Sequence, residues 1–157
     1  MTTQLFDFDI VLSKAQKYCA YQERCQWDML KKFRDWRVDE EIQDEVLSEL
    51  ITQNFINEER FAFQFAAGKF RIKNWGRQKI KIELKKRQIS TYSINKALDG
   101  IDQEEYGLTL QKLIANKGKE VSAKNEYEKK QKIAQYLHSK GYESELIWES
   151  LQITENE

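Results

Sequence analysis

The sequence predicts an all-α fold built from three tandem three-helix repeats. The 157 residues include no proline and only six glycines, and 33% are charged, mostly lysine and glutamate. This composition is typical of helices joined by short turns. Apolar residues recur at helical spacing, and a trio of apolar residues returns with a period near fifty residues.

The first repeat is expected to contain three short helices, over residues 10–20, 26–36 and 40–52. One stripe of the first helix holds Val11, Ala15, Tyr18 and Cys19. Asp39 is expected to cap the third helix, because an acceptor side chain there satisfies free amide groups and its charge suits the helix dipole.

A period of about fifty residues repeats this arrangement. Phe33, Val38 and Leu47 have counterparts 51 residues later in Leu84, Ile89 and Leu98, and 53 residues further on in Leu137, Tyr142 and Leu151. The helix start at Asp39 has counterparts at Ser90 and Glu143. A unit this small buries its apolar face mainly by stacking on a neighbour. We therefore expect nine helices in three consecutive units, at residues 9–53, 54–101 and 102–153.

The second repeat carries apolar residues on two sides of its helices. In the helix expected over 57–73, one stripe holds Phe61, Phe65 and Ile72, and the opposite side holds Phe63 and Phe70. In the next helix Ile80 and Leu84 face one way, and Trp75 and Ile82 the other. An ordinary surface helix has one apolar stripe, so two stripes predict elements contacted on both sides. A central repeat flanked by two others is expected to show this pattern.

The third repeat is expected to contain helices over residues 103–116, 123–139 and 144–151. Lys117-Gly118 and Lys140-Gly141 are the predicted helix stops, because glycine adopts the left-handed conformation that commonly ends a helix. The loop over 117–122 is expected to be the most flexible point.

The chain has no net charge, but its charges are segregated. Residues 35–59 hold nine acids and one arginine, a net of −8, and residues 69–96 hold ten basic residues and one acid, a net of +9. The basic block is either a solvated helix face, paired or not with the acidic block, or a surface for phosphates or an acidic protein. The candidate binding residues are Lys69, Arg71, Lys73, Arg77, Lys79, Lys81, Lys85, Lys86 and Arg87.

The sequence disfavours several other classes of protein. No apolar run reaches the roughly 20 residues that span a bilayer, so we expect a cytoplasmic protein with no membrane contact. Cys19 and Cys25 have no second pair or histidine cluster at metal-ligand spacing and are expected to be reduced packing residues. His138 is the only histidine, and no phosphate-binding glycine loop occurs. We therefore expect no metal, no cofactor and no enzymatic activity.

The central segment resembles the signature of a known family. It reads Phe55-Ile56-Asn57-Glu58-Glu59-Arg60-Phe61-Ala62, then Gly68-Lys69-Phe70-Arg71-Ile72-Lys73-Asn74-Trp75-Gly76-Arg77, then Ile80-x3-Leu84. This pattern closely resembles the central signature of the RecX family of recombination regulators. The family's three tandem three-helix repeats agree with the period of about fifty residues, so the resemblance covers nearly the whole chain.

The resemblance implies a protein of DNA repair and homologous recombination that binds the RecA recombinase. It implies that the protein lodges in the groove of the RecA filament on single-stranded DNA and limits filament growth, ATP hydrolysis and strand exchange. By the same resemblance, Lys69, Arg71, Lys73, Arg77 and Lys79 would face RecA or the DNA, and Phe61, Phe65, Trp75, Ile80 and Leu84 would be core. The first repeat departs from the family pattern, because residues 18–25 lack its usual arginine-rich segment.

The main hypothesis is therefore a non-enzymatic regulator of the RecA filament, with an elongated, curved three-repeat array that spans adjacent RecA protomers. We expect a monomer, because the partner filament is larger than the protein. One alternative is a single-stranded nucleic-acid-binding module that competes with RecA for DNA. Another is a helical scaffold for an unrelated acidic protein.

Overall fold

The computed structural model describes residues 7–155, and the side chains up to Gln152. Within this range the chain forms nine α-helices and no strand, so the predicted all-α class is confirmed. Their bounds are α1 Phe8–Tyr21, α2 Gln26–Asp35, α3 Glu40–Thr52, α4 Glu58–Lys73, α5 Arg77–Lys86, α6 Thr91–Asp99, α7 Gln103–Glu120, α8 Glu126–Lys140 and α9 Ser144–Glu155. None of these helices combines the length and apolar character that crossing a bilayer requires.

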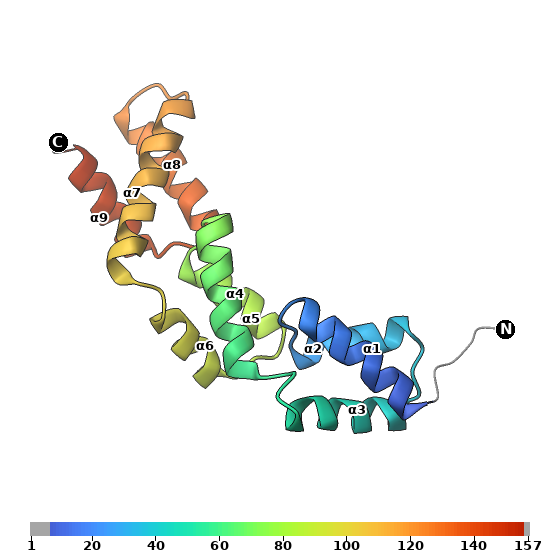
Figure 1. Cartoon of the computed structure of the whole chain (residues 1–157). Helices are drawn as coiled ribbons and strands as arrows, with labels where there is room; N and C mark the ends of the chain where they lie inside the picture. Colours follow the sequence, from blue (N-terminus) through green and yellow to red (C-terminus); the bar gives the residue numbers. More distant parts are fainter. Residues whose placement is uncertain (1–6, 156–157) are drawn as a thin grey trace.

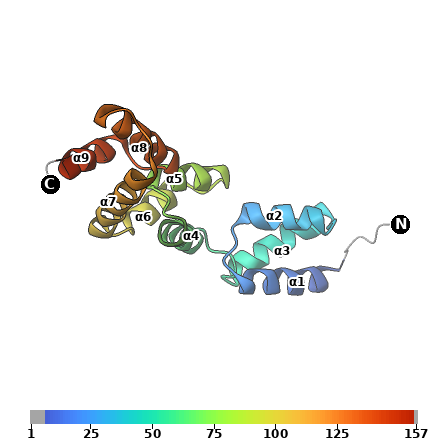
Figure 2. The same cartoon turned by 90° about the horizontal axis from the view of Figure 1, so that it is seen from above.

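The helices form an elongated, bent body in which three groups follow one another in chain order. Helices α1–α3 form one limb, α4–α6 the middle and α7–α9 the other limb (Figures 1 and 2). Helix α4 runs from the bend, where it follows α3 through a short linker, to the start of the second limb, where it approaches α8 (Figure 1). The predicted curved array of three-helix repeats is therefore confirmed.

Two hydrophobic cores lie inside this body. The first is formed by α1–α3 around residues such as Val11, Met29 and Phe33, each fully buried. The second is continuous through α4–α9, and it includes Leu84 of the middle group and Leu137 of the last. The second and third groups of helices thus share one interior. The division of the chain at 53/54 and 101/102 into three domains stays a prediction.

Local capping signals locate most helix ends. The Ser90 hydroxyl accepts the Ser93 amide at the start of α6, and Gly141 ends α8 with φ of 100°. Asp39 lies at the N-cap of α3, but its side chain accepts no capping hydrogen bond. The predicted stop at Lys117-Gly118 is wrong, since α7 continues to Glu120. Glycine permits the left-handed conformation that ends a helix but does not require it, and among the glycines of the described residues only Gly141 adopts a positive φ, so Gly118 supplies no stop.

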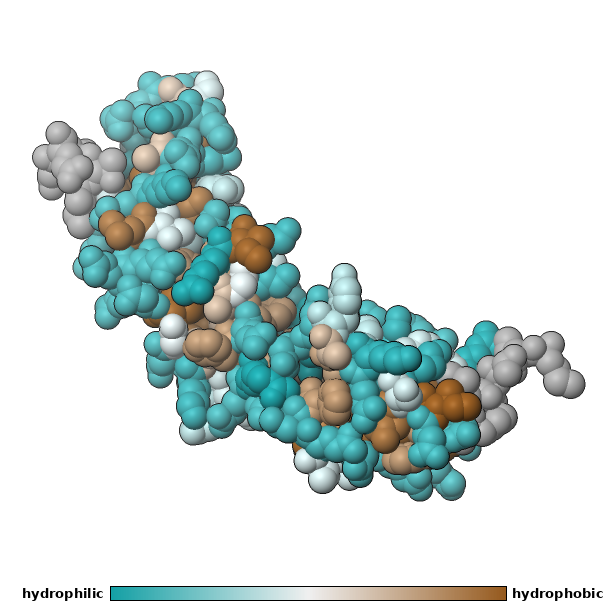
Figure 3. Space-filling view, in the orientation of Figure 1, coloured by the Kyte–Doolittle hydropathy of each residue, from teal (hydrophilic) through white to brown (hydrophobic). Residues whose placement is uncertain are grey.

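The predicted two-sided contact of the middle helices is only partly correct. Phe61 and Phe70 are buried, but Phe63, Ile72 and Ile82 are 54%, 78% and 64% exposed. Figure 3 shows apolar surface at the end of α4 that approaches α8, on a face that is otherwise mostly hydrophilic. Exposure does not follow the two predicted stripes, because Ile72 of the first is exposed and Phe70 of the second is buried.

Both cysteines are free and buried, as predicted, at 7% exposed for Cys19 and 1% for Cys25. Burial raises the pKa of Cys19 to about 11 and that of Cys25 to about 12, from an ordinary value of 9.0. Because the thiolate is the reactive form, we expect both thiols to react with Ellman's reagent at pH 8 at least a hundredfold more slowly in the native protein than in guanidinium chloride.

The raised pKa values of the two thiols make the stability of the fold depend on pH. The folded-state pKa values lie above the unfolded value, so the thiols favour the folded state below about pH 9, and this contribution is lost as the pH rises toward 11 and 12. Urea unfolding of the wild type and of a Cys25→Ala variant at pH 7 and pH 10 checks this. The pH-dependent loss of stability should be smaller in the variant. An equal loss, or fast labelling of the native thiols, would contradict the assignment.

Candidate basic surface at the centre of the array

The lysines of α5 lie on its outward face because Ile80 and Leu84 turn the opposite face into the core. Lys85 and Lys86 are exposed and Lys81 is half-buried. In the described part of the chain none of the three forms an ion pair with a carboxylate. Ile82, 64% exposed, lies among them. The outer face of α5 is therefore strongly positive with an apolar residue at its centre.

A second group of cations surrounds the turn between α4 and α5. The Nζ atoms of Lys69 and Lys79 lie 5.0 and 4.7 Å from the ring centroid of Trp75. An aromatic ring attracts an ammonium group over its face. Trp75 is itself half-buried and packs edge-on against Phe65 at 6.4 Å between centroids. Trp75 thus holds two lysines in place. Because the lysines lie over its ring, the ring is not free to stack on a base.

Lys140, at the end of α8, joins the same group. Its Nζ donates to the backbone oxygen of Lys73 at 2.8 Å. Its partial burial and the charges of Lys79 and Lys73 lower the pKa of Lys140. We call Lys69, Lys73, Lys79 and Lys140 the lysine cluster. No carboxylate in the described residues pairs with it. The sequence singled out the first three but not Lys140, because nothing local connects residue 140 with residue 73.

A tight junction between α8 and α5 brings this cluster together. The amides of Gly76 and Gln78 donate to the oxygens of Lys140 and Gly141, each at 2.8 Å. The start of α5 therefore meets the end of α8 backbone to backbone. Gly76 is at the closest point, since a Cβ there would lie 2.4 Å from the carbonyl carbon of Gly141.

Arg77, one of the three arginines predicted to bind a partner, is occupied inside the molecule. Arg77 forms an ion pair with Glu143 at 2.9 Å, and its guanidinium lies 3.8 Å from the centroid of Tyr106. The Tyr106 hydroxyl donates to Glu143 and accepts from the Arg77 amide at 3.0 Å. Burial and the bond to Glu143 raise the pKa of Tyr106. This network ties the middle group to the last one.

The other two arginines differ in how firmly they are held. Arg87 pairs with Glu83 at 3.1 Å, and its guanidinium lies 4.9 Å from the centroid of Phe65. Arg71 reaches Glu105 only at 3.8 Å, with both side chains well exposed. An exposed pair of this length contributes little to stability. Of the three arginines, Arg71 is therefore the most available to a partner.

The acidic block lies elsewhere. Its helix α3 forms the outer side of the first limb, away from α5 (Figure 1). The pair between Lys96 and Glu59 at 3.2 Å joins the acidic and basic blocks, and it is well exposed. No other ion pair in the described residues does so. Pairing of the two blocks within the molecule therefore does not account for the basic one.

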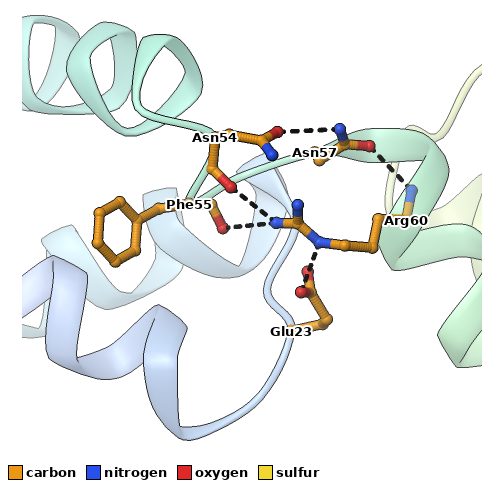
Figure 4. Close-up of polar contacts among 5 residues, drawn as sticks. All are labelled: Glu23, Asn54, Phe55, Asn57 and Arg60. Atoms are coloured by element: carbon orange, nitrogen blue, oxygen red, sulfur yellow. Dashed lines mark hydrogen bonds and ion pairs between the residues drawn. The ribbon is translucent and has the colours of Figure 1, made fainter.

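The bend between the first and second groups is held by Arg60, at the start of α4. Its Nε lies 2.6 Å from Glu23, in the turn after α1, and its Nη2 donates to the backbone oxygens of Asn54 and Phe55 (Figure 4). Asn57 caps α4 through the Arg60 amide. One side chain thus joins three segments at the bend.

A groove of about 330 Å³ runs along α4 from this bend toward the lysine cluster. We call it the elbow groove, and it is lined by Gln22, Glu23, Phe61, Gln64, Phe65, Gly68, Lys69, Ile72 and Lys73. Gln22 and Glu23 form the wall opposite α4. Lys69 and Lys73 belong both to the groove and to the lysine cluster, so the two features are continuous. No group of three or more side chains within residues 7–152 is arranged to hold a metal ion.

Two family models match this chain. One describes the second three-helix domain of RecX and matches residues 57–98, and the other describes the third and matches residues 104–151. The chain belongs to the RecX family. The RecX signature read from residues 55–84 lies largely within the first of these matches.

Curated RecX relatives show the same similarity. The chain is 27% identical over 135 residues to a regulatory protein RecX of Lactobacillus johnsonii, covering 86% of this chain and 50% of the relative. It is 29% identical over 149 residues to that of Leuconostoc mesenteroides, covering 93% and 55%. The chain therefore spans about half the length of the curated RecX proteins that it matches.

Solved RecX structures share the fold. A crystal structure of RecX from Lactobacillus salivarius matches with a TM-score of 0.84 at 22% identity, covering 96% of this chain and 97% of that one. A crystal structure of a regulatory protein RecX matches with a TM-score of 0.83 at 23% identity, covering 92% and 71%. These likenesses concern the arrangement of the helices.

Proposed function

We propose that this chain is a non-enzymatic regulator that binds the RecA filament on single-stranded DNA and inhibits its growth, ATP hydrolysis and strand exchange. The observation that carries the proposal is the lysine cluster with the adjacent outer face of α5. Their cations have no carboxylate partner in the described residues. Gathering like charges without counter-charges is unfavourable, and a negatively charged partner relieves the repulsion. The curated relatives are named regulatory proteins RecX, which agrees with this role.

The separation of charge suits a partner with both signs on its surface. The basic residues occupy the middle of the array and the acidic face of α3 occupies the first limb. Complementary potentials of this kind fix orientation and speed association more than they add affinity. We propose that the array spans adjacent RecA protomers as a monomer, and that it acts where RecA acts, in the cytoplasm. Arg71, Lys81, Lys85 and Lys86 are available for the contact, whereas Arg77 and Arg87 mainly support the surface.

Charge reversal tests the proposal. A variant carrying Lys79→Glu, Lys81→Glu, Lys85→Glu and Lys86→Glu is expected to lose all inhibition of the DNA-dependent ATPase of RecA, because each substitution replaces attraction by repulsion. Circular dichroism should show unchanged helical content, since none of the four side chains is buried. A matched control reverses four exposed lysines elsewhere: Lys17, Lys112, Lys119 and Lys124. The control changes the net charge equally and should keep inhibition. Full inhibition by the first variant would remove this surface from the mechanism.

A second candidate is a nucleic-acid-binding module that acts by competing with RecA for single-stranded DNA. The lysine cluster favours it, because lysines contact phosphates without sequence specificity. This candidate predicts binding to DNA alone, with an affinity that falls steeply as salt rises, and no complex with RecA when DNA is absent. Separate titrations against RecA, single-stranded DNA and the filament distinguish it from the regulator.

A further inference from the structure

No contact within the described part of the chain requires glycine at position 68. It lies in the interior of α4, where glycine is among the least favourable residues. A Cβ at this position would meet no atom within 4 Å, its chain neighbours and its own helix backbone aside. By contrast, Gly76 and Gly141 are required by close backbone contacts. The missing side chain at Gly68 leaves open space, and that space is part of the elbow groove.

The groove has the character of a docking site for one apolar side chain. Phe61 and Phe65 give it an apolar floor, and Ile72, 78% exposed, lies at its edge. Lys69 and Lys73 stand at one end and have no carboxylate partner in the described residues. An apolar side chain flanked by carboxylates is therefore complementary to it in both polarity and charge.

A nucleobase fits the groove less well. Bases bind single-strand sites by stacking on exposed aromatic faces. Here Lys69 and Arg87 lie over Phe65 at 5.4 and 4.9 Å from its centroid, and Phe61 packs against it at 5.7 Å. Trp75 is covered by Lys69 and Lys79. The aromatic rings near the groove are thus already in contact with cations and with each other, so protein is the favoured occupant.

We propose that the elbow groove binds an apolar side chain of a RecA subunit, presented next to acidic residues that meet Lys69 and Lys73. This inference rests on the proposed function and adds to it the place and chemistry of a protein contact. The opposite wall, Glu23, is held by Arg60, so the groove exists in the free molecule before a partner binds. The inference also assigns different contacts to two surfaces. The groove contacts protein, and the outer lysines contact negative charge from either RecA or DNA.

Filling the groove tests the inference. Gly68→Leu places a side chain in the open space and is expected to weaken binding to the assembled RecA filament at least tenfold, measured by fluorescence anisotropy with a labelled form of this protein. The matched control is Gly107→Leu, because Gly107 is also inside a helix and a Cβ there also meets nothing within 4 Å, but it lies outside the groove. The control should bind within twofold of the wild type. Thermal unfolding of both variants should occur at or above the wild-type temperature.

A rim variant guards against an indirect effect of leucine on α4. Ile72→Ser removes an exposed apolar side chain and should weaken filament binding severalfold with unchanged stability. Binding of Gly68→Leu and Ile72→Ser at wild-type affinity would overturn the inference while the proposed function stands. If the two variants lose binding to free single-stranded DNA but bind DNA-free RecA as the wild type does, the groove is assigned to nucleic acid. That result would also overturn the inference. Absence of binding to RecA and filament by the wild type would reject the proposed function itself.

Discussion

Replacing Gly76 by alanine is expected to lower the free energy of unfolding by about 3 kcal/mol. This loss has two sources, an overpacked contact and two weakened backbone hydrogen bonds. The added Cβ would lie 2.4 Å from the carbonyl carbon and oxygen of Gly141 and 2.5 Å from the Tyr142 amide nitrogen. All three are backbone atoms, so no side-chain rotation removes the clash. The ends of α5 and α8 must move apart.

This separation has a consequence for the lysine cluster. The bonds from Gly76 and Gln78 to the end of α8 hold Lys140 beside Lys73 and Lys79. When these bonds lengthen, Lys140 moves toward solvent, and its lowered pKa should return toward the ordinary value. A structural substitution is thus expected to weaken the proposed binding surface without changing any of its charges.

Urea unfolding measures the effect on stability, and Gly107→Ala is the matched control. Gly107 is inside α7 with open space around its Cα, so alanine there should be neutral or stabilise by up to about 1 kcal/mol. A midpoint for Gly76→Ala equal to that of the wild type would mean that the junction gives way easily and does not hold the two groups together.

Replacing Arg60 by alanine is expected to loosen the bend and to cost about 2 kcal/mol, the contribution of hydrogen bonds to a charged group after allowance for partial exposure. Arg60 bonds to Glu23 at 2.6 Å, to the oxygen of Asn54 at 2.9 Å and to that of Phe55 at 3.3 Å. The first two groups of helices have separate cores, with Cys25 as the buried residue of the first limb that belongs to the second core. Trp27 of α2 also packs against the second core, with the Arg87 guanidinium 5.4 Å from the centroid of its ring, so loss of Arg60 is expected to loosen the bend and not to release it.

Two measurements report on the bend. Small-angle X-ray scattering should give a larger radius of gyration for Arg60→Ala, and maleimide labelling of Cys25 should become faster because this residue lies at the junction. Arg71→Ala is the control, since it also removes an arginine from α4. Arg71 is exposed, and it reaches the carboxylate of Glu105 only at 3.8 Å. Arg60→Lys keeps the charge but not the forked donors and should fall between. Identical scattering and labelling for Arg60→Ala and Arg71→Ala would show that other contacts hold the bend.

Much of the helical framework could be predicted from the sequence. Glu40–Thr52 is found as predicted, and the end of α8 lies at Gly141 because glycine there adopts a φ of 100°. Such signals act within one turn of helix, so they are visible in a short stretch of residues. The failure at Gly118 shows their limit. Glycine allows a helix to end but does not force it to, and Gly118 does not adopt the positive φ of Gly141, so α7 continues to Glu120.

The candidate site divides in the same way. Composition and spacing are enough to predict the helices, their repetition and the excess of positive charge over residues 69–96. The meeting of Lys140 with Lys73 and Lys79, the ion pair of Arg77 with Glu143 and the exposure of Ile72 and Ile82 depend on how the helices pack. Helical periodicity states which residues share a face, but not what lies against that face. The neighbour depends on backbone contacts such as that of Gly76 with Gly141, which join residues 65 positions apart.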